Sequence, residues 1–493
     1  MVLGVFVLLL VSLPVLLLAT GTIDPTSLRM MLNVMVGAEG PTTDEATARQ
    51  RYSLPEGFAL SVYSNAVPKA RFMRFTAAGD LLVSRPHNGD ILLLRRDTDG
   101  DNKPDGQEVL LSGLKRPLGL VVTGSWLYIA ESHQVGRVLF DEALGRLDGE
   151  YHPIIEGLTD NGNHWSKTIG IGPDDMLYLA QGSTCNICEE EDDRRATMMR
   201  FNKDGTGGEI IATGLRNSVG FDWAPWNDAL YATDNGRDLM GDDFPPCELN
   251  RIEPGKFYGW PYFNGDNQPD PDMGEDPQER NPTAPVHPFR AHNAPLGITF
   301  LDSANLPADY QRTALAALHG SWNRSSPDGY KVVSLHFTDA GVEERDFLSG
   351  FNSSEGITGR PVDVVQGPAG DIYISDDYAG AIYRVTYTGS SVADTAALTD
   401  LAPVTRLDDT APGWLAQEDL VALGNAGAAL YTLHDCAACH ERGENPRLLT
   451  NLAARLGYNA VDQVLREPPS PMPLYPLTVQ ERRALAVYLL SQD

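Results

Sequence analysis

Between residues 53 and 388 the chain repeats one pattern of hydrophobic and polar positions: an apolar, aromatic-rich strand, a polar turn and a second strand. Six copies follow one another, at 79–96, 125–140, 175–201, 228–252, 313–337 and 370–387. Short strands with turns at such regular spacing are typical of a β-propeller, and six copies predict six blades. One larger gap, 253–290, is rich in Pro, Gly and Asp, and we expect an insertion there, after the fourth blade.

A different pattern follows the propeller. The β pattern stops after residue 388, and residues 389–413 are predicted to form a linker. Residues 414–493 are helical in pattern, and their last helix opens with a capping box made by Thr478 and Glu481. The sequence therefore predicts an all-β six-bladed propeller over 53–388 followed by a small all-α domain.

The N-terminal segment is apolar without interruption from residue 2 to residue 19. Such a stretch within residues 1–20 predicts an export signal peptide or a membrane anchor, although it lacks a basic start and an A-x-A cleavage site. Either function sends the chain across a membrane, so we expect a periplasmic protein, soluble or anchored through 2–19. Residues 21–52 are mostly polar and are predicted to be a linker.

The composition narrows the classes of partner. The 493 residues are enough for two or three folded units, and hydrophobic residues make up 42% of them, which argues against global disorder. The net charge of −29 repels a phosphate backbone, so nucleic acid is excluded as a partner.

The sequence CAACH, residues 436–440, carries the clearest chemistry of the helical domain. Two thiols three positions apart can add to the vinyl groups of a haem, and the following imidazole can ligate its iron. The alternatives are a chance motif or half of a zinc site, but no further Cys or His follows it. The prediction is a cytochrome c domain with haem c bound covalently to Cys436 and Cys439 and ligated by His440. Met472, in a Pro-rich loop, is the expected sixth ligand; the alternatives are a core methionine there and His434 as ligand.

Three cysteines remain. Cys185 and Cys188 form a second C-x-x-C, without a following His. In an exported protein this spacing favours a short-loop disulfide over a redox pair, since no βαβ pattern surrounds it. Cys247 is then expected to be a free, buried thiol.

An acidic segment, DTDGDNKPDGQE at 97–108, spaces carboxylates at alternate positions around a turn. Oxygen ligands so arranged suit a structural Ca²⁺ ion, and the candidate ligands are Asp97, Asp99, Asp101 and Asp105. The glycine stands at position 4 of the segment and not at position 6, so the loop is no regular EF-hand. The alternative is a solvated acidic hairpin turn.

Several polar residues precede or follow predicted strands and could meet at one end of the channel. They are His164, Arg216, Asn217, Gly236, Arg237, His292, Asn323, Arg324 and Arg360. A lone His is more often structural and a lone Arg more often a surface charge. Together they supply one base and several cations, which suits a substrate that loses a proton and a hydride beside an anionic cofactor.

The order and spacing of several motifs over 53–388 resemble those of the quinoprotein sugar dehydrogenases: soluble aldose and glucose, sorbosone and fungal pyranose dehydrogenases. The motifs are NHWSKTIGIGPDDMLYLAQGS, GLRNSVGFDW, TDNGRD with ELNRI and FYGWPY, HNAPLGITF, HGSWNR with GYKVV, and GRPVDVVQGPAGDIYISDD. The resemblance implies pyrroloquinoline quinone (PQQ) bound with Ca²⁺ at the channel end. It also implies oxidation of the anomeric hydroxyl of a sugar or of an aldehyde hydrate.

The resemblance assigns roles by position. It makes His164 the catalytic base, eight residues before the Gly-Pro-Asp at 172–174, and makes Arg216 and Asn217 contacts of the quinone. The remaining roles are carbonyl ligands of the cofactor Ca²⁺ for Gly236 and Arg237, a carboxylate contact for Arg360, a basic contact for Asn323 or Arg324, and a polar contact for His292. The sugar-binding glutamine of the soluble glucose enzymes has no match.

These expectations combine into one scheme. A sugar, or an aldehyde or alcohol derived from one, is oxidised in the propeller; the electrons pass to haem c and then to a respiratory cytochrome, oxidase or quinone. The alternative is a propeller without PQQ that only binds a carbohydrate or protein, with the haem domain as an electron relay. Retention of His164, Arg216 and Arg360 argues against it.

Overall fold

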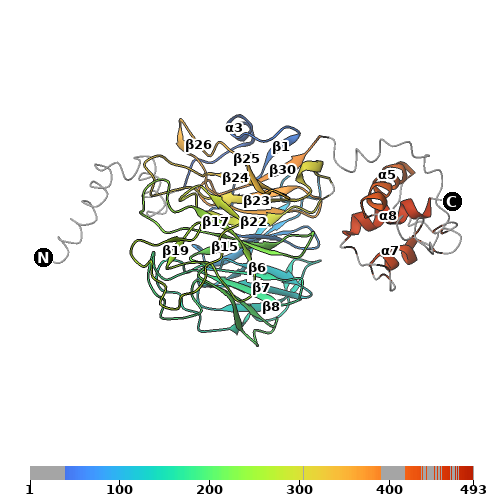
Figure 1. The fold of residues 1–493 in the computed structure, drawn as a ribbon. Helices are drawn as coiled ribbons and strands as arrows, with labels where there is room; N and C mark the ends of the chain where they lie inside the picture. Colours follow the sequence, from blue (N-terminus) through green and yellow to red (C-terminus); the bar gives the residue numbers. More distant parts are fainter. Residues whose placement is uncertain are drawn as a thin grey trace. The chain divides into compact units, whose positions relative to one another are not determined.

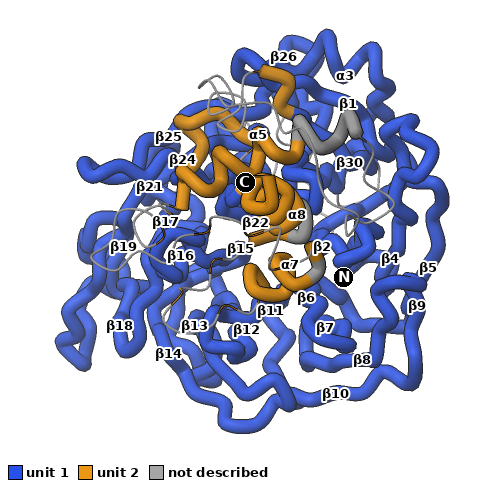
Figure 2. Tube along the Cα trace, turned by 90° about the vertical axis from the view of Figure 1, so that its right-hand side faces the viewer, with its two compact units in different colours: residues 1–302, 312–386 blue, residues 303–311, 387–493 orange. Residues whose placement is uncertain are grey.

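The computed structural model describes residues 39–303 and 305–389 and, further on, 417–434, 436, 440, 449, 452, 456, 458–466, 468, 472, 475 and 477–491. It consists of two compact units, Met1–Asp302 with Arg312–Thr386 and Ser303–Gln311 with Tyr387–Asp493 (Figure 2). The apolar segment predicted at 2–19 and the linker predicted at 389–413 lie outside the described residues, apart from residue 389.

The first unit is a six-bladed propeller, seen along its axis in Figure 2. From the inner to the outer strand, the first three blades are β2 (Met73–Phe75), β3 (Leu81–Arg85), β4 (Asp90–Arg95), β5 (Gly106–Ser112); β6 (Leu120–Thr123), β7 (Trp126–Ala130), β8 (Val135–Asp141), β10 (His152–Ile155); and β11 (Lys167–Ile171), β12 (Leu177–Gln181), β13 (Thr197–Phe201), β14 (Glu209–Thr213). The next three are β15 (Ser218–Trp223), β16 (Leu230–Asp234), β17 (Cys247–Ile252), β21 (His287–Phe289); β22 (Pro295–Phe300), β23 (Thr313–Leu318), β24 (Lys331–Thr338), β25 (Gly341–Leu348); and β28 (Pro361–Gln366), β29 (Ile372–Asp376), β30 (Ala381–Tyr387), β1 (Phe58–Ser64).

The propeller is closed at two levels. Its inner strands β2, β6, β11, β15, β22 and β28 contact one another in this order, and β28 returns to β2. The strand β1, which precedes the first blade in sequence, pairs with β30 as the outer strand of the sixth blade (Figure 1). This non-local pairing locks the two ends of the propeller together.

The six predicted copies are the second and third strands of the six blades. In the first blade, for example, β3 pairs antiparallel with β4 from Leu81↔Leu94 to Arg85↔Asp90. Every residue of β3 is buried, because each blade is packed between two others. The prediction of six blades is therefore confirmed.

The segment 253–290, predicted as an insertion after the fourth blade, lies within that blade, because it contains the outer strand β21. It begins with β18 (Lys256–Phe257), which pairs parallel with β14 of the third blade. It continues through the hairpin β19 (Phe263–Asn264) and β20 (Gln268–Pro269) to the outer strand β21. The expectation was wrong because β21 is only three residues long, and its one buried side chain, Phe289, makes no hydrophobic pattern.

Part of the segment predicted as a linker before the propeller is helical. Helix α3 (Glu45–Arg51) begins at Asp44, whose Oδ1 accepts a hydrogen bond from the N–H of Thr47 at 2.7 Å. Oε2 of Glu45 accepts a hydrogen bond from the N–H of Val62 in β1 at 2.7 Å. The helix therefore packs on the outer strand of the sixth blade. No helix among the described residues is long and apolar enough to span a membrane.

The second unit is helical, with α5 (Gln417–Leu433), α7 (Tyr458–Arg466) and α8 (Val479–Leu490), and it also includes the short 3-10 helix η1 (Ala308–Tyr310). The capping box predicted at the start of α8 is present, with Thr478 and Glu481 each bonded to the other's backbone N–H. A Cβ on Gly427 of α5 would meet the carbonyl oxygen of Ala484 in α8. The two helices can approach closely because this residue is glycine.

The propeller also contains three short additional strands, β9 (Arg146–Leu147), β26 (Asn352–Ser353) and β27 (Gly356–Ile357).

Candidate active site

The predicted polar residues of the propeller lie in the segments that lead into inner strands. His164 precedes β11, Arg216 and Asn217 precede β15, His292 precedes β22, and Arg360 directly precedes β28. Inner strands of a propeller run in the same direction along the central channel. These segments therefore lie at one end of the propeller, together with the ends of the second strands that pair with them.

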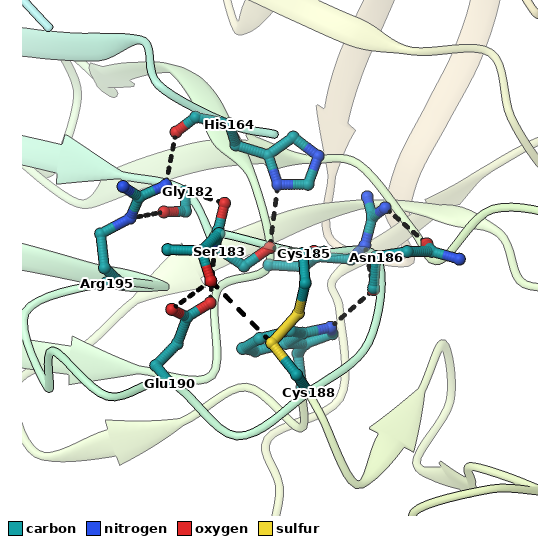
Figure 3. Close-up of a disulfide and its surroundings, with 11 residues drawn as sticks. His164, Gly182, Ser183, Cys185, Asn186, Cys188, Glu190 and Arg195 are labelled. Atoms are coloured by element: carbon teal, nitrogen blue, oxygen red, sulfur yellow. Dashed lines mark hydrogen bonds between the residues drawn. A yellow bond between two sulfur atoms is a disulfide. The ribbon is translucent and has the colours of Figure 1, made fainter. Parts of the chain in front are cut away.

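The imidazole of His164 is held by the loop after β12 (Figure 3). Its Nδ1 lies 2.8 Å from Oγ of Ser183, and the Ser183 hydroxyl donates a hydrogen bond to the carbonyl of Cys185 at 2.7 Å. The other ring nitrogen, Nε2, makes no hydrogen bond within the described chain. The ring is therefore anchored on one side and free on the other.

Gly182 lets His164 and Asn217 approach each other. A Cβ on Gly182 would lie 2.6 Å from both Oδ1 of Asn217 and Cβ of His164. Such distances are closer than real contacts allow, so a side chain here would push the two residues apart. The amide of Asn217 makes no hydrogen bond to another described group, which leaves it available to a ligand.

Two arginines and the burial of the ring set the charge of His164. Burial, and then the positive charges of Arg216 and Arg195, lower the pKa of His164 to about 3. Arg195 is itself fixed, because its guanidinium donates to the carbonyls of His164, Ser183 and Gly182 at 2.9, 2.8 and 2.5 Å. His164 is consequently neutral at neutral pH and can accept a proton.

Arg216 is a buried cation whose guanidinium is fixed on three sides. Its Nε and Nη2 donate to the backbone and side-chain oxygens of Asn186 at 3.0 and 2.8 Å. Nη2 also bonds Asp238 at 2.8 Å, and Nη1 donates to the carbonyl of Asn235 at 3.0 Å. Only 4% of the side chain is exposed. The position of the positive charge is therefore fixed before any ligand binds.

Asp238 extends this network to the fifth blade. Its Oδ1 accepts a hydrogen bond from Nδ2 of Asn323 at 3.3 Å, and the same Nδ2 lies 3.5 Å from Nδ1 of His292. Nε2 of His292 is 2.7 Å from the carbonyl of Gly241. Oδ1 of Asn323 is buried and has no partner among the described residues. The N–H of Ser183 donates to the carbonyl of Arg216 at 2.7 Å. One network thus joins His164, Arg216, Asn323 and His292 across three blades.

Arg360 belongs to a second network, between the fifth, sixth and first blades. Its Nη2 donates to Nδ1 of His319 at 2.9 Å, and Nε2 of His319 lies 3.0 Å from Oδ1 of Asp377. Arg71 bonds the other oxygen of Asp377 at 2.7 Å. Because Nδ1 accepts from Arg360, Nε2 must carry the proton that is donated to Asp377.

Three of the predicted residues, Arg237, Arg324 and Gly236, have side chains or Cα positions that contact other protein groups. The guanidinium of Arg237 bonds Asp270 at 2.6 Å and also bonds Asp272, both in the insertion. Arg324 donates to the carbonyls of Asp242 and Ala291. Gly236 is packed so closely that a Cβ would lie 2.6 Å from the carbonyl oxygen of Pro246. The side chains of Arg237 and Arg324 are thus engaged by protein groups, and the backbone carbonyls at 236 and 237 are the groups left for a metal.

The motif LAQGSTCNIC holds residues that sequence reasoning missed. Ser183 and Asn186 flank Cys185, and the disulfide predicted between Cys185 and Cys188 is present. Asp238 and His319 were also missed, although each stands within or beside a quoted motif.

Cys247 is buried and free, as predicted, and burial raises the pKa of its thiol to about 11.

The predicted calcium loop joins β4 to β5. The carboxylates of Asp97, Asp99 and Asp101 offer oxygens within 4.8 Å of one another, as a cation would need. Asp105 is not part of this group; its Oδ2 accepts a hydrogen bond from the N–H of Thr98 at 3.1 Å, within the same loop. Position 6 of the loop, where an EF-hand has glycine, is Asn102 with φ +66°. The backbone therefore makes this turn without a glycine at position 6.

The residues predicted to bind haem belong to the second unit. Within the described part of it, Cys436 and Met472 are partly buried against the core of α5, α7 and α8. The N–H of His440 donates to the carbonyl of Cys436 at 3.0 Å, so these two residues are one helical turn apart. The ring of His434 lies against Tyr475, with 4.7 Å between ring centres. Cys439 lies outside the described residues, and the haem assignment stays a prediction.

Comparisons with known proteins agree with this architecture. The family model "Glucose / Sorbosone dehydrogenase" matches residues 130–384. An uncharacterized protein of Borreliella burgdorferi is 39% identical over 379 residues, which cover 73% of this chain and 96% of that protein. The aldose sugar dehydrogenase of Escherichia coli is 23% identical over 288 residues, which cover 53% of this chain and 72% of that enzyme.

Two solved structures share the propeller fold. The calcium structure of the family AA12 carbohydrate-active enzyme from Trichoderma reesei matches with a TM-score of 0.61 at 20% identity, over 70% of this chain and 98% of that one. The holo PQQ domain of pyranose dehydrogenase from Coprinopsis cinerea matches with a TM-score of 0.57 at 20% identity, over 68% and 97%. At this identity the likeness concerns the fold.

Proposed function

Because the chain belongs to the glucose/sorbosone dehydrogenase family, we propose that it is a PQQ-dependent dehydrogenase. Its substrate is a sugar, or an aldehyde or alcohol derived from a sugar, and its electrons leave through a haem c bound to the second unit. The solved relative from Coprinopsis cinerea is described as the holo form of a PQQ domain, which supports the choice of cofactor.

The residues at the channel end fit this cofactor. PQQ is a flat anionic quinone whose edge carries several carboxylates, and it requires cations and amide groups around it. Arg216 and Arg360 supply buried or half-buried guanidinium groups. The side-chain amide of Asn217 and Oδ1 of Asn323, both without a partner among the described residues, supply neutral contacts. The carbonyls of Gly236 and Arg237 remain available to the Ca²⁺ that accompanies the cofactor.

His164 is the general base of the proposed reaction. Its neutral ring presents Nε2, which has no partner among the described residues, so this atom can take the hydroxyl proton of the substrate. Binding of an anion beside Arg216 would offset the positive charge that now depresses the pKa of His164. The base therefore becomes stronger when the site is loaded. PQQ, when bound, supplies the acceptor of the hydride that leaves the same carbon.

Arg216 stabilises the negative charge that develops opposite it during hydride transfer. Its guanidinium is held by Asn186, Asn235 and Asp238, so it need not reorganise when the charge appears. A fixed donor in a buried site contributes far more than the same donor in water. This preorganisation explains why an arginine, and not a mobile lysine, occupies the position.

The second unit is proposed to carry the electrons away. Cys436 and Cys439 would hold the haem covalently, and His440 and Met472 would ligate its iron. The tether between the units raises the effective concentration of the acceptor near the donor. We assign the protein to the periplasm, soluble or anchored by residues 2–19, with a respiratory cytochrome, oxidase or quinone as the next acceptor.

One observation carries the proposal: the half-buried, neutral His164, whose Nε2 makes no hydrogen bond among the described residues, stands in the same network as the buried Arg216. The experiment is to load the purified protein with PQQ and Ca²⁺ and to follow reduction of an artificial dye with a panel of aldoses, sugar aldehydes and alcohols. The proposal predicts PQQ-dependent turnover of at least one sugar-type substrate. Turnover of none of them, with PQQ shown to be bound, would overturn it.

A further inference from the structure

The hydroxyl of Ser183 has one proton and two neighbours. Its Oγ lies 2.8 Å from Nδ1 of His164 and 2.7 Å from the carbonyl oxygen of Cys185. The carbonyl can only accept, so the hydroxyl proton must go to it, and Nδ1 must then donate its own proton to Oγ. The reverse arrangement would leave the two oxygens facing each other without a proton. Ser183 therefore selects the tautomer of His164 in which Nε2 carries the lone pair.

Asn186 acts on Arg216 from the same loop. Its backbone oxygen accepts from Nε of Arg216 at 3.0 Å and from Nε1 of Trp260 at 3.3 Å. Its Oδ1 accepts from Nη2 of Arg216 and from the N–H of Asp238, both at 2.8 Å. Two of the bonds that orient the guanidinium therefore come from this one residue.

The acceptors for both networks are backbone carbonyls of the loop, at Cys185 and Asn186. A carbonyl is placed by the conformation of its chain and not by a rotamer, so the loop must be rigid. The disulfide between Cys185 and Cys188 closes it (Figure 3). Glu190 holds the other side, since its carboxylate accepts from the N–H and the hydroxyl of Thr184 at 2.6 and 2.8 Å. A closed loop of this kind has few alternative conformations.

We infer that the loop 183–188, closed at 185–188 by the disulfide, is a positioning element for both functional side chains. Through Ser183 it keeps Nε2 of His164 unprotonated and aimed at the site, and through Asn186 it aims the guanidinium of Arg216. The kinetic consequences of this inference rest on the proposed function, but the tautomer does not.

The first test replaces Ser183 by alanine and observes His164 by ¹⁵N NMR of histidine-labelled protein, with its signal assigned by loss in His164→Asn. The wild type is expected to show a protonated Nδ1 and a bare Nε2 at neutral pH. Ser183→Ala should show a mixture of tautomers and a kcat reduced roughly 10- to 100-fold, the cost of removing a group that orients a functional histidine. KM should change little.

Ser375→Ala is the matched control. Ser375 is equally buried, donates to the carbonyl of Arg71 at 2.7 Å and accepts from the N–H of Asp363 at 3.1 Å, but it contacts no imidazole. This variant should keep the His164 tautomer and the kcat. A Ser183→Ala protein with the wild-type tautomer and rate would overturn the inference.

The second test separates the two arms of the loop. Asn186→Ala should weaken PQQ binding about 10-fold, the loss of a hydrogen bond to a charged group, and leave the His164 tautomer unchanged. The double variant Cys185→Ser/Cys188→Ser should show both defects at once. A folded double variant with neither defect would contradict the role of the disulfide; if it does not fold, the two single variants decide.

The outcomes also distinguish this inference from the proposed function. A protein that oxidises no sugar but loses its single tautomer in Ser183→Ala would overturn the dehydrogenase proposal alone. A protein that oxidises sugar and keeps rate and tautomer in Ser183→Ala would overturn the positioning role alone.

Discussion

The guanidinium of Arg360 donates a hydrogen bond to Nδ1 of His319, with 2.9 Å between the atoms. Burial, and then the positive charge of Arg360, lower the pKa of His319 to about 4. The ring is thus neutral at neutral pH, and it remains an acceptor for Arg360 while its Nε2 faces Asp377. A residue outside the predicted set therefore orients the arginine that is proposed to hold the cofactor carboxylates.

Replacing His319 by alanine should loosen Arg360 and weaken PQQ binding about 10- to 100-fold, since a charged hydrogen bond is lost. Affinity is measured by titrating the apoprotein with PQQ. His287→Ala is the control, because His287 bonds Glu344 at 2.8 Å on the outer strands, away from the inner-strand segments. Unchanged affinity in His319→Ala would show that Arg360 needs no such support.

Arg216→Lys should lower kcat about 100- to 1000-fold, the usual cost of removing one preorganised donor. Lysine keeps the charge but cannot reach Asn186, Asn235 and Asp238 with one ammonium group. Arg200→Lys, which alters a half-exposed arginine bonded to Glu209, should have no effect. A wild-type kcat in Arg216→Lys would show that charge alone suffices.

The fourth blade contains two adjacent buried acids that should make stability depend on pH. Asp234 and Glu248 are paired across β16 and β17, and burial raises their pKa values to about 7 and about 8, the latter also through the charge of Asp234. The folded state therefore keeps the Glu248 proton over a range in which the unfolded chain has lost it. Stability should fall as pH rises from about 4.5 to about 8, by up to about 1.4 kcal/mol per pH unit for this group.

Glu248→Gln should remove that part of the pH dependence. In the wild type, Nδ2 of Asn250 faces Glu248, and Oδ1 of Asn250 is buried without a partner among the described residues. If the Asn250 side-chain amide rotates by half a turn, the glutamine amide of the variant can donate to this Oδ1. Urea unfolding at mildly acidic and at alkaline pH measures the effect, with the half-exposed Glu253→Gln as control. An equally steep loss of stability in Glu248→Gln would place the responsible group elsewhere.

The acidic loop between β4 and β5 should bind Ca²⁺ through Asp97, Asp99 and Asp101. In protein free of PQQ, Ca²⁺ at 100 times its Kd should add about 2.7 kcal/mol of stability, seen as a higher Tm. Asp99→Asn should lose most of this gain, whereas Asp148→Asn, an exposed acid elsewhere, should keep it. A wild-type Tm that does not respond to Ca²⁺ would leave the loop as a solvated turn.

The sequence reveals those parts of the fold that are locally encoded. The second and third strands of each blade are buried on both faces, so their apolar runs are visible; β3, for example, is buried at every position. Outer strands such as β5 are mostly exposed and carry no such signal. The closure of the sixth blade by β1 joins residues more than 300 positions apart, and no local pattern encodes it.

The site divides in the same way. The sequence motifs identify His164, Arg216 and Arg360, because their residue types suggest chemistry by themselves. Ser183 and His319 act only through a partner that the fold brings close, 19 and 41 positions away in sequence. Their types are common in ordinary turns and strand ends, so sequence reasoning gives them no weight until the contact is seen.

The central claim is that sugar oxidation at His164 delivers electrons to the haem of the same chain. Its most direct test is the absorbance of haem c after an aldose is mixed with protein loaded with PQQ and Ca²⁺, in the wild type and in His164→Ala. We predict haem reduction that requires both substrate and PQQ and that slows about 100- to 10,000-fold in His164→Ala, the usual contribution of a general base. Haem that stays oxidised with every sugar-type substrate, or that is reduced at the full rate without His164, would contradict the account.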